Sequence, residues 1–144
     1  MTSLSDYFTM ASSDERREKR PHRVLVVDCE PLLTRSLGKL LRSHGYVAAE
    51  ENDPSKALST ARRFRPDIIL LDLHLPWRDG NKVVAALAAD QLLRRLPIIF
   101  MTADSPEQDK PALTLPILVK PFTIDALLAR LVEAITKTSR KEDT

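Results

Sequence analysis

Residues 23–33, RVLVVDCEPLL, combine a strand signal with a helix signal in one short segment. Residues 24–27 are wholly apolar and include three valines, which is typical of a strand buried on both faces. Pro31 favours the first turn of a helix, and leucines then recur at helical spacing until His44-Gly45. The segment predicts a strand that leads directly into a helix, with two acidic residues and the chain's only cysteine at the junction.

The same alternation of strand and helix continues to the end of the chain. Further strands are predicted at residues 46–49, 68–71, 98–101 and 117–119, and further helices after Asp53-Pro54, over about 81–94, and after Thr123. Five such units predict a parallel sheet with helices on both faces. Right-handed crossovers favour the strand order 2-1-3-4-5, so the fold class is an α/β flavodoxin-like doubly wound (βα)5 sandwich.

Composition limits the classes of function. A chain of 144 residues with 43% hydrophobic residues can bury one core, which we place at residues 23–136, between a mobile N-terminal tail (1–22) and a polar C-terminal tail (137–144). The net charge is +2 and the basic residues are scattered, so nucleic acid is not an expected partner. The sequence contains no apolar run of about 18 residues and no signal-peptide pattern. We therefore expect a cytoplasmic protein with no membrane contact.

Polar side chains follow four of the predicted strands. Asp28, Cys29 and Glu30 come after the first strand, and the other three strands are followed by Asp72, Thr102 and Lys120. The carboxyl ends of parallel strands meet at one edge, where ligands bind at the switch between strands 1 and 3. Carboxylates gathered there would repel one another unless a cation joined them, and hard oxygen ligands suit Mg²⁺. A lysine and a hydroxyl beside such carboxylates indicate phosphoryl chemistry, with the Asp72 carboxylate as nucleophile.

Each of these residues has an ordinary structural explanation when it is taken alone. An aspartate after a strand is often only a helix cap, a threonine is often a turn residue, and a lysine before proline is usually solvated. Capping does not require four polar types at the ends of four buried strands, since the second strand carries none and its helix has its own cap at Asp53. The joint pattern favours a site.

Four motifs, VLVVDCEP, PDIILLDLHLPWRDG, PIIFMTA and LVKPF, resemble those of the receiver domain of two-component response regulators over residues 24 to about 136. The resemblance implies that Asp72 accepts a phosphoryl group from a histidine kinase or histidine phosphotransfer protein. It also implies that Thr102 is the switch hydroxyl, that Lys120 pairs with the phosphorylated aspartate, and that Lys120-Pro121 is cis. Mg²⁺ would be held by Asp28, Asp72 and the backbone carbonyl of His74.

The sequence departs from this family at two places. Cys29 occupies the position of the second acid, which normally touches the metal, and a soft, mostly protonated thiol predicts weaker Mg²⁺ binding. Glu30 could reach the ion by a longer path; Cys29 could instead fill space, or, as a minor alternative, sense redox state or a soft metal. Between Thr102 and Lys120 three prolines and a short segment predict a shortened or irregular fourth helix, with at most two turns.

Three functions follow from these observations. The first is a stand-alone receiver that accepts phosphate on Asp72 and signals through an unidentified downstream protein, with at most self-catalysed phosphotransfer and autodephosphorylation and with homodimerisation left open. The second is a pseudo-receiver, an interaction module that binds Mg²⁺ poorly and no longer cycles phosphate. A small phosphohydrolase is the weakest, because no added general base appears.

Overall fold

The computed structural model describes residues 20–72, 79–103 and 116–142, and it contains one parallel five-stranded sheet. The strands stand in the order β2-β1-β3-β4-β5, which confirms the predicted topology. Their bounds are Arg23–Val27 (β1), Val47–Glu51 (β2), Ile68–Asp72 (β3), Ile98–Thr102 (β4) and Ile117–Val119 (β5). Every strand pair is parallel, so the carboxyl ends of all five strands lie at the same edge.

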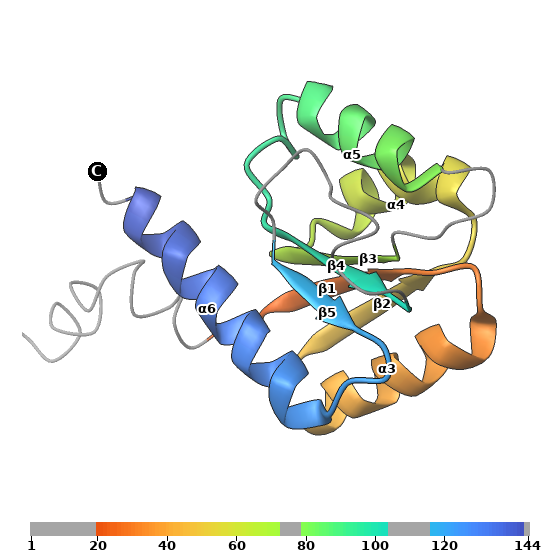
Figure 1. Cartoon of the computed structure of the whole chain (residues 1–144). Coiled ribbons are helices and arrows are strands. Elements are labelled where there is room, and N and C mark those ends of the chain that lie inside the picture. Colours follow the sequence, from red (N-terminus) through yellow and green to blue (C-terminus); the bar gives the residue numbers. More distant parts are fainter. Residues whose placement is uncertain (1–19, 73–78, 104–115, 143–144) are drawn as a thin grey trace, which may run out of the picture.

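Helices cover both faces of the sheet (Figure 1). α3 (Pro31–Ser43) and α6 (Ile124–Glu142) lie on one face, and α4 (Ala57–Phe64) and α5 (Asp79–Ala89) lie on the other. A short 3-10 helix, η1 (Pro54–Lys56), precedes α4. No helix in the part of the chain that the structure describes is long and apolar enough to cross a bilayer.

The sheet separates two apolar cores because alternate strand residues point to opposite faces. β3 contributes to both: Ile68 and Leu70 pack with α3 and α6, whereas Ile69 and Leu71 pack with α4 and α5. All five residues of β3 are buried. This explains why its sequence is continuously apolar up to Asp72, as expected of a strand covered on both sides.

Helix boundaries follow local signals that the sequence carries. Pro31 opens α3, and the helix ends at Ser43 with Gly45 just beyond it at φ +88°, a left-handed conformation that suits glycine. The Asp53 carboxylate accepts the N–H of Ser55, and the Thr123 hydroxyl accepts the N–H of Ala126. The predicted cap at Thr123 and the cis bond between Lys120 and Pro121 are confirmed. Asp53 caps η1 rather than α4, whose own N-cap residue, Lys56, makes no side-chain capping bond.

Several predicted boundaries are wrong. β2 begins at Val47 and continues to Glu51, two residues past its predicted end, because it pairs with the whole of β1. α5 stops at Ala89 rather than near 94, since the Asp90 side chain accepts the N–H of Leu92 and turns the chain. Leu40, one of the leucines that recur at helical spacing in α3, is 42% exposed.

Within the described residues, the folded domain extends into both proposed tails. Residues 137–142 belong to α6, which contains no proline or glycine and continues as a polar helix. His22 accepts the N–H of Val47, and Arg20 forms an ion pair with Asp67, so the folded domain already begins before residue 23. Residues 1–19, 143–144 and the segment 104–115, where a shortened helix was predicted, lie outside the described residues.

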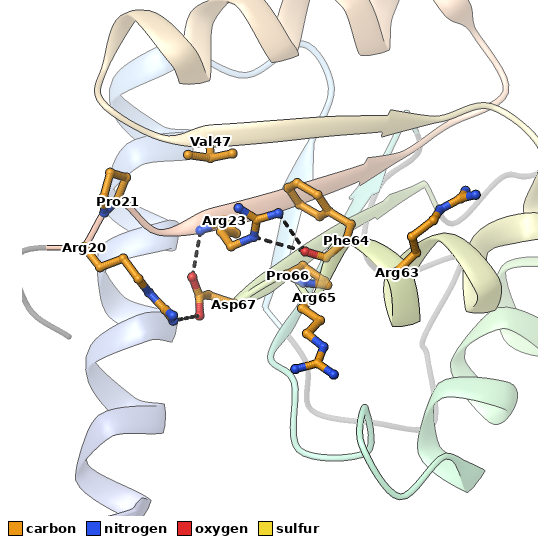
Figure 2. A pocket seen from close by; sticks show the side chains of 9 residues that line it. All are labelled: Arg20, Pro21, Arg23, Val47, Arg63, Phe64, Arg65, Pro66 and Asp67. Atoms are coloured by element: carbon orange, nitrogen blue, oxygen red, sulfur yellow. Dashed lines mark hydrogen bonds and ion pairs between the residues drawn. The ribbon is translucent and has the colours of Figure 1, made fainter. Parts of the chain in front are cut away.

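A cavity of about 650 Å³ lies at the amino ends of β1 and β2, opposite the edge that carries the predicted site (Figure 2). Arg23 and Phe64 form part of its wall: the guanidinium donates to the Phe64 carbonyl and stacks 4.2 Å from the ring centre. Arg63 and Arg65 point away from this contact in different directions. Because the guanidinium groups do not converge on one point, this cavity does not form a ready anion site.

Candidate functional site

Four strands bring the predicted site residues to the carboxyl edge of the sheet. Asp28 directly follows β1, Asp72 ends β3, Thr102 ends β4, and Lys120 directly follows β5. The register places Asp72 beside Met101 and Thr102 beside Val119. Residues that are up to 92 positions apart in the sequence therefore meet at one place.

The centre of the site is an ammonium group held by two buried carboxylates. Lys120 Nζ lies 2.8 Å from Asp28 Oδ2 and 3.7 Å from Asp72 Oδ2. The Asp28 side chain is fully buried and that of Asp72 is 7% exposed. Since two carboxylates so close together repel, the ammonium compensates their charge within the fold.

Backbone groups fix the orientation of Asp28. Its Oδ1 accepts the N–H of Glu30 at 3.0 Å, while Oδ2 accepts Lys120. The Asp28 N–H donates to Glu51 O, at the end of β2. Both carboxylate oxygens are thus engaged before any ligand enters.

Lys120 stays charged in this setting. Burial alone would lower the pKa of its ammonium, but the hydrogen bond from Lys120 to Asp28 and the charges of Asp72 and Asp28 outweigh burial and raise the pKa above its ordinary value of 10.5. The group therefore carries a full positive charge at neutral pH. It can neutralise a dianion that forms at Asp72.

Cys29 places a thiol beside the same carboxylates. Ligand atoms of Asp28, Cys29 and Asp72 all lie within 4.8 Å of one another, which is the spacing of a candidate metal centre. Burial, followed by the negative charges of Asp28 and Asp72, raises the pKa of the thiol above its ordinary value of 9.0. Two carboxylates fit Mg²⁺, which binds through one or two of them plus water, whereas the protonated thiol does not.

The remaining predicted site residues are Glu30, Thr102 and His74. Glu30 is exposed, and among the described residues its carboxylate is not part of the metal-type cluster, although its charge acts on Cys29 and Lys120. Thr102 is only 1% exposed, and its carbonyl accepts the backbone N–H of Lys120 at 2.6 Å. The backbone carbonyl of His74 lies outside the described residues.

Sequence reasoning missed a polar support on the β2 side of the site. The Asn52 amide donates to Asp28 O at 2.7 Å and to Thr34 Oγ1 at 2.9 Å, so it joins the end of β2 to the junction between β1 and α3. The expectation that the second strand carries no polar residue at its end was wrong. Because the strand runs to Glu51, Asn52 is the residue that directly follows it. A polar residue directly after a strand is the same sequence signal that identified Asp28 and Lys120.

Comparison with known proteins agrees with this geometry. Residues 24–132 match the model of the response regulator receiver domain. The transcriptional regulatory protein PdtaR of Mycobacterium tuberculosis is 31% identical over 122 residues, which cover 81% of this chain and 58% of that protein. The chain spans little more than half the length of the curated relatives that it matches first.

Solved structures match over nearly their whole length. The receiver domain of the sensor histidine kinase PA1611 from Pseudomonas aeruginosa, described with a magnesium ion coordinated in its active-site cleft, has a TM-score of 0.73 and 30% identity, covering 81% of this chain and 99% of that one. The chemotaxis response regulator CheY4 of Vibrio cholerae has a TM-score of 0.72 and 28% identity, with coverage of 80% and 99%. The chain belongs to the receiver domain family of two-component response regulators.

Proposed function

We propose that this receiver domain accepts a phosphoryl group on Asp72 from a histidine kinase or a histidine phosphotransfer protein. The observation that carries the proposal is the position of Lys120, whose ammonium lies against both Asp28 and Asp72 at the carboxyl edge of the sheet. A buried carboxylate beside a fixed cation is arranged to become an acyl phosphate and to keep the added charge compensated.

In the proposed transfer, an Asp72 carboxylate oxygen attacks the phosphorus of a phosphohistidine. A P–O bond forms, the P–N bond breaks, and the imidazole of the donor leaves with the electron pair. Lys120 then neutralises charge on the phosphoryl oxygens, and the Thr102 hydroxyl donates a hydrogen bond to one of them. Mg²⁺ bound by Asp28, Asp72 and the His74 carbonyl would supply further positive charge to those oxygens. In this proposal the chain catalyses at most its own phosphorylation, from the phosphohistidine of the donor, and its own dephosphorylation.

The signal would leave through protein contacts near β4, β5 and α6. Thr102 ends β4, and its carbonyl accepts a hydrogen bond from the backbone N–H of Lys120. A movement of Thr102 toward the phosphoryl group would therefore also shift the end of β5. Ile117, at the start of β5, is half-buried, and Val119, at its end, is 40% exposed. β5 is the last strand of the sheet, so a change at its end would be close to a surface that a downstream protein could contact.

The test is phosphorylation by a small acyl phosphate in the presence of Mg²⁺. We expect a mass increase of one phosphoryl group in the wild type, removed by hydroxylamine, and no increase in Asp72→Asn. Asp125→Asn, which changes an exposed carboxylate on α6, is the matched control and should be modified like the wild type. An unmodified wild type, or an Asp72→Asn protein that is still modified, would contradict the proposal.

A pseudo-receiver remains the second candidate because of the thiol at position 29. If weak Mg²⁺ binding is the only defect, Cys29→Asp should tighten Mg²⁺ binding by about 10-fold, since it restores a hard third ligand. Calorimetric titration of Mg²⁺ measures this directly, with fluorescence of the only tryptophan, Trp77, as a second readout. A wild type that binds no Mg²⁺ and accepts no phosphoryl group, beside a Cys29→Asp protein that does both, would favour the pseudo-receiver.

A further inference from the structure

We propose that the cation site formed by Asp28, Cys29 and Asp72 selects a thiophilic divalent cation, of which Zn²⁺ is the biological example, over Mg²⁺. The inference rests on the cation site of the proposed function and assigns its metal preference. Its basis is the donor set: two carboxylates from two different strands and one thiol, with ligand atoms that all lie within 4.8 Å of one another.

Geometry allows the three donors to reach one ion after a small movement. In a tetrahedral Zn²⁺ site, with Zn–S of about 2.3 Å and Zn–O of about 2.0–2.2 Å, neighbouring donor atoms lie roughly 3.3–3.7 Å apart. The three donors of the cluster therefore have to approach by at most about 1.5 Å. An octahedral Mg²⁺ site sets neighbouring ligands at 90° rather than at the wider tetrahedral angle, so the carboxylate oxygens would have to approach more closely, and Mg²⁺ does not favour the sulfur atom.

The thiol decides the preference because the carboxylates serve both ions. Carboxylate oxygens can serve as ligands to either ion, but a thiolate is a soft ligand that strengthens binding of Zn²⁺ or Co²⁺ far more than that of Mg²⁺. Cys29 is half-buried at the edge of the α4 and α5 core, so its sulfur is already held beside the carboxylates. When the metal binds, the thiol proton is released to solvent.

Lys120 is the internal competitor for this site. Its ammonium donates to Asp28 Oδ2 at 2.8 Å and lies 3.7 Å from Asp72, so a divalent cation must displace it from Asp28. This competition affects every metal, whereas the thiol adds affinity only for thiophilic ions. The ammonium therefore lowers the affinity for every divalent cation by the same factor, and the metal–sulfur bond alone sets the difference between Zn²⁺ and Mg²⁺.

Co²⁺ provides a direct readout, because a thiolate bound to Co²⁺ gives a sulfur-to-cobalt charge-transfer band in the near ultraviolet. Cys29 is the only cysteine of the chain, so the band can come from no other thiol. We expect the reduced wild-type protein to show this band with one Co²⁺ per chain. Zn²⁺ should abolish it at stoichiometric amounts, whereas Mg²⁺ should need at least about 100-fold more.

Three variants separate the donors. Cys29→Ser should lose the band and weaken Zn²⁺ binding by about 10-fold or more while changing Mg²⁺ binding by less than about twofold. Asp72→Asn should weaken both metals, and His44→Ala, which changes an exposed histidine on the far end of α3, should leave the band unchanged.

The inference is overturned if saturating Co²⁺ gives no charge-transfer band, if the band persists in Asp72→Asn at wild-type affinity, or if Mg²⁺ displaces Co²⁺ as readily as Zn²⁺ does. These measurements use no phosphoryl donor. A protein that shows the band but accepts no phosphate would refute the proposed function alone, and a protein that accepts phosphate with Mg²⁺ but shows no band would refute the metal preference alone.

Discussion

Lys120 is the residue whose removal should change the site most. Without the ammonium, Asp28 and Asp72 face each other in a buried setting, and Asp28 Oδ2 loses its hydrogen-bond donor. Since one member of a buried ion pair is removed, we expect Lys120→Met to lower the free energy of unfolding by about 2–4 kcal/mol at neutral pH. Urea unfolding in the presence of a chelator measures this loss, with the exposed Lys137→Met on α6 as control.

The pH dependence of this loss follows from the direction of the Lys120 pKa shift. The folded-state pKa is raised above 10.5, so the stabilisation is fully present below that value and is lost only as the pH rises through the folded-state pKa. The difference between wild type and Lys120→Met should therefore be constant between about pH 7 and 9. A difference that fades over that range would show that Lys120 is not held by the carboxylates.

At the scale of single residues, sequence reasoning identified the side chains better than their partners. Asp28, Asp72 and Lys120 were found because they follow buried strands, and the structure brings them together. Asn52 was missed because the end of β2 was placed too early, and Glu30 could not be distinguished from a ligand by spacing alone. Which of two acidic side chains, two positions apart in the sequence, points into a site depends on tertiary packing.

At the scale of elements, α4 and α5 are joined by an ion pair that also ends a helix. Arg62 Nε on α4 donates to Asp90 Oδ2 at 2.6 Å, and Asp90 Oδ1 accepts the N–H of Leu92. Burial alone would raise the pKa of the Asp90 carboxyl, but the hydrogen bonds from Arg62 and Leu92 outweigh burial and hold the pKa below 3.8. The helix therefore ends where Asp90 is captured, which its apolar periodicity could not predict.

Replacing Asp90 should make the free energy of unfolding less dependent on pH in the acid range. Because the folded-state pKa is lowered, the stabilisation is present above the unfolded value of 3.8 and is lost as the pH falls through the lower folded-state value. Asp90→Asn should lower the urea midpoint at about pH 7, and its difference from the wild type should narrow only below about pH 4. Glu133→Gln, which removes an exposed ion pair within α6, is the control and should change little. An equal difference at all pH values would contradict this assignment.

At the scale of the whole molecule, the topology was predictable because it depends on repeated local signals. Five apolar runs alternating with capped amphipathic segments admit few arrangements once crossovers are right-handed, and the observed order is the predicted one. The exact strand and helix ends were less predictable. β2 extends as far as it can pair with β1, and α6 continues beyond its last apolar residues. Pairing across the sheet, rather than the strand's own sequence, decides such ends.

The two cores share one sheet and should therefore unfold together. Leu70 is buried against α3 and α6, and its neighbour Ile69 is buried against α4 and α5. We expect Leu70→Ala and Ile69→Ala each to lower the free energy of unfolding by about 2–5 kcal/mol, because each leaves a cavity in one core. Leu32→Ala, at an 81% exposed position on α3, should change it by less than about 0.5 kcal/mol. Both core variants should retain a single urea transition with coincident far-ultraviolet circular dichroism and fluorescence, since β3 is continuous through both cores. Two separate transitions, or a lower free energy of unfolding in only one of the two core variants, would mean that one layer of helices folds without the other.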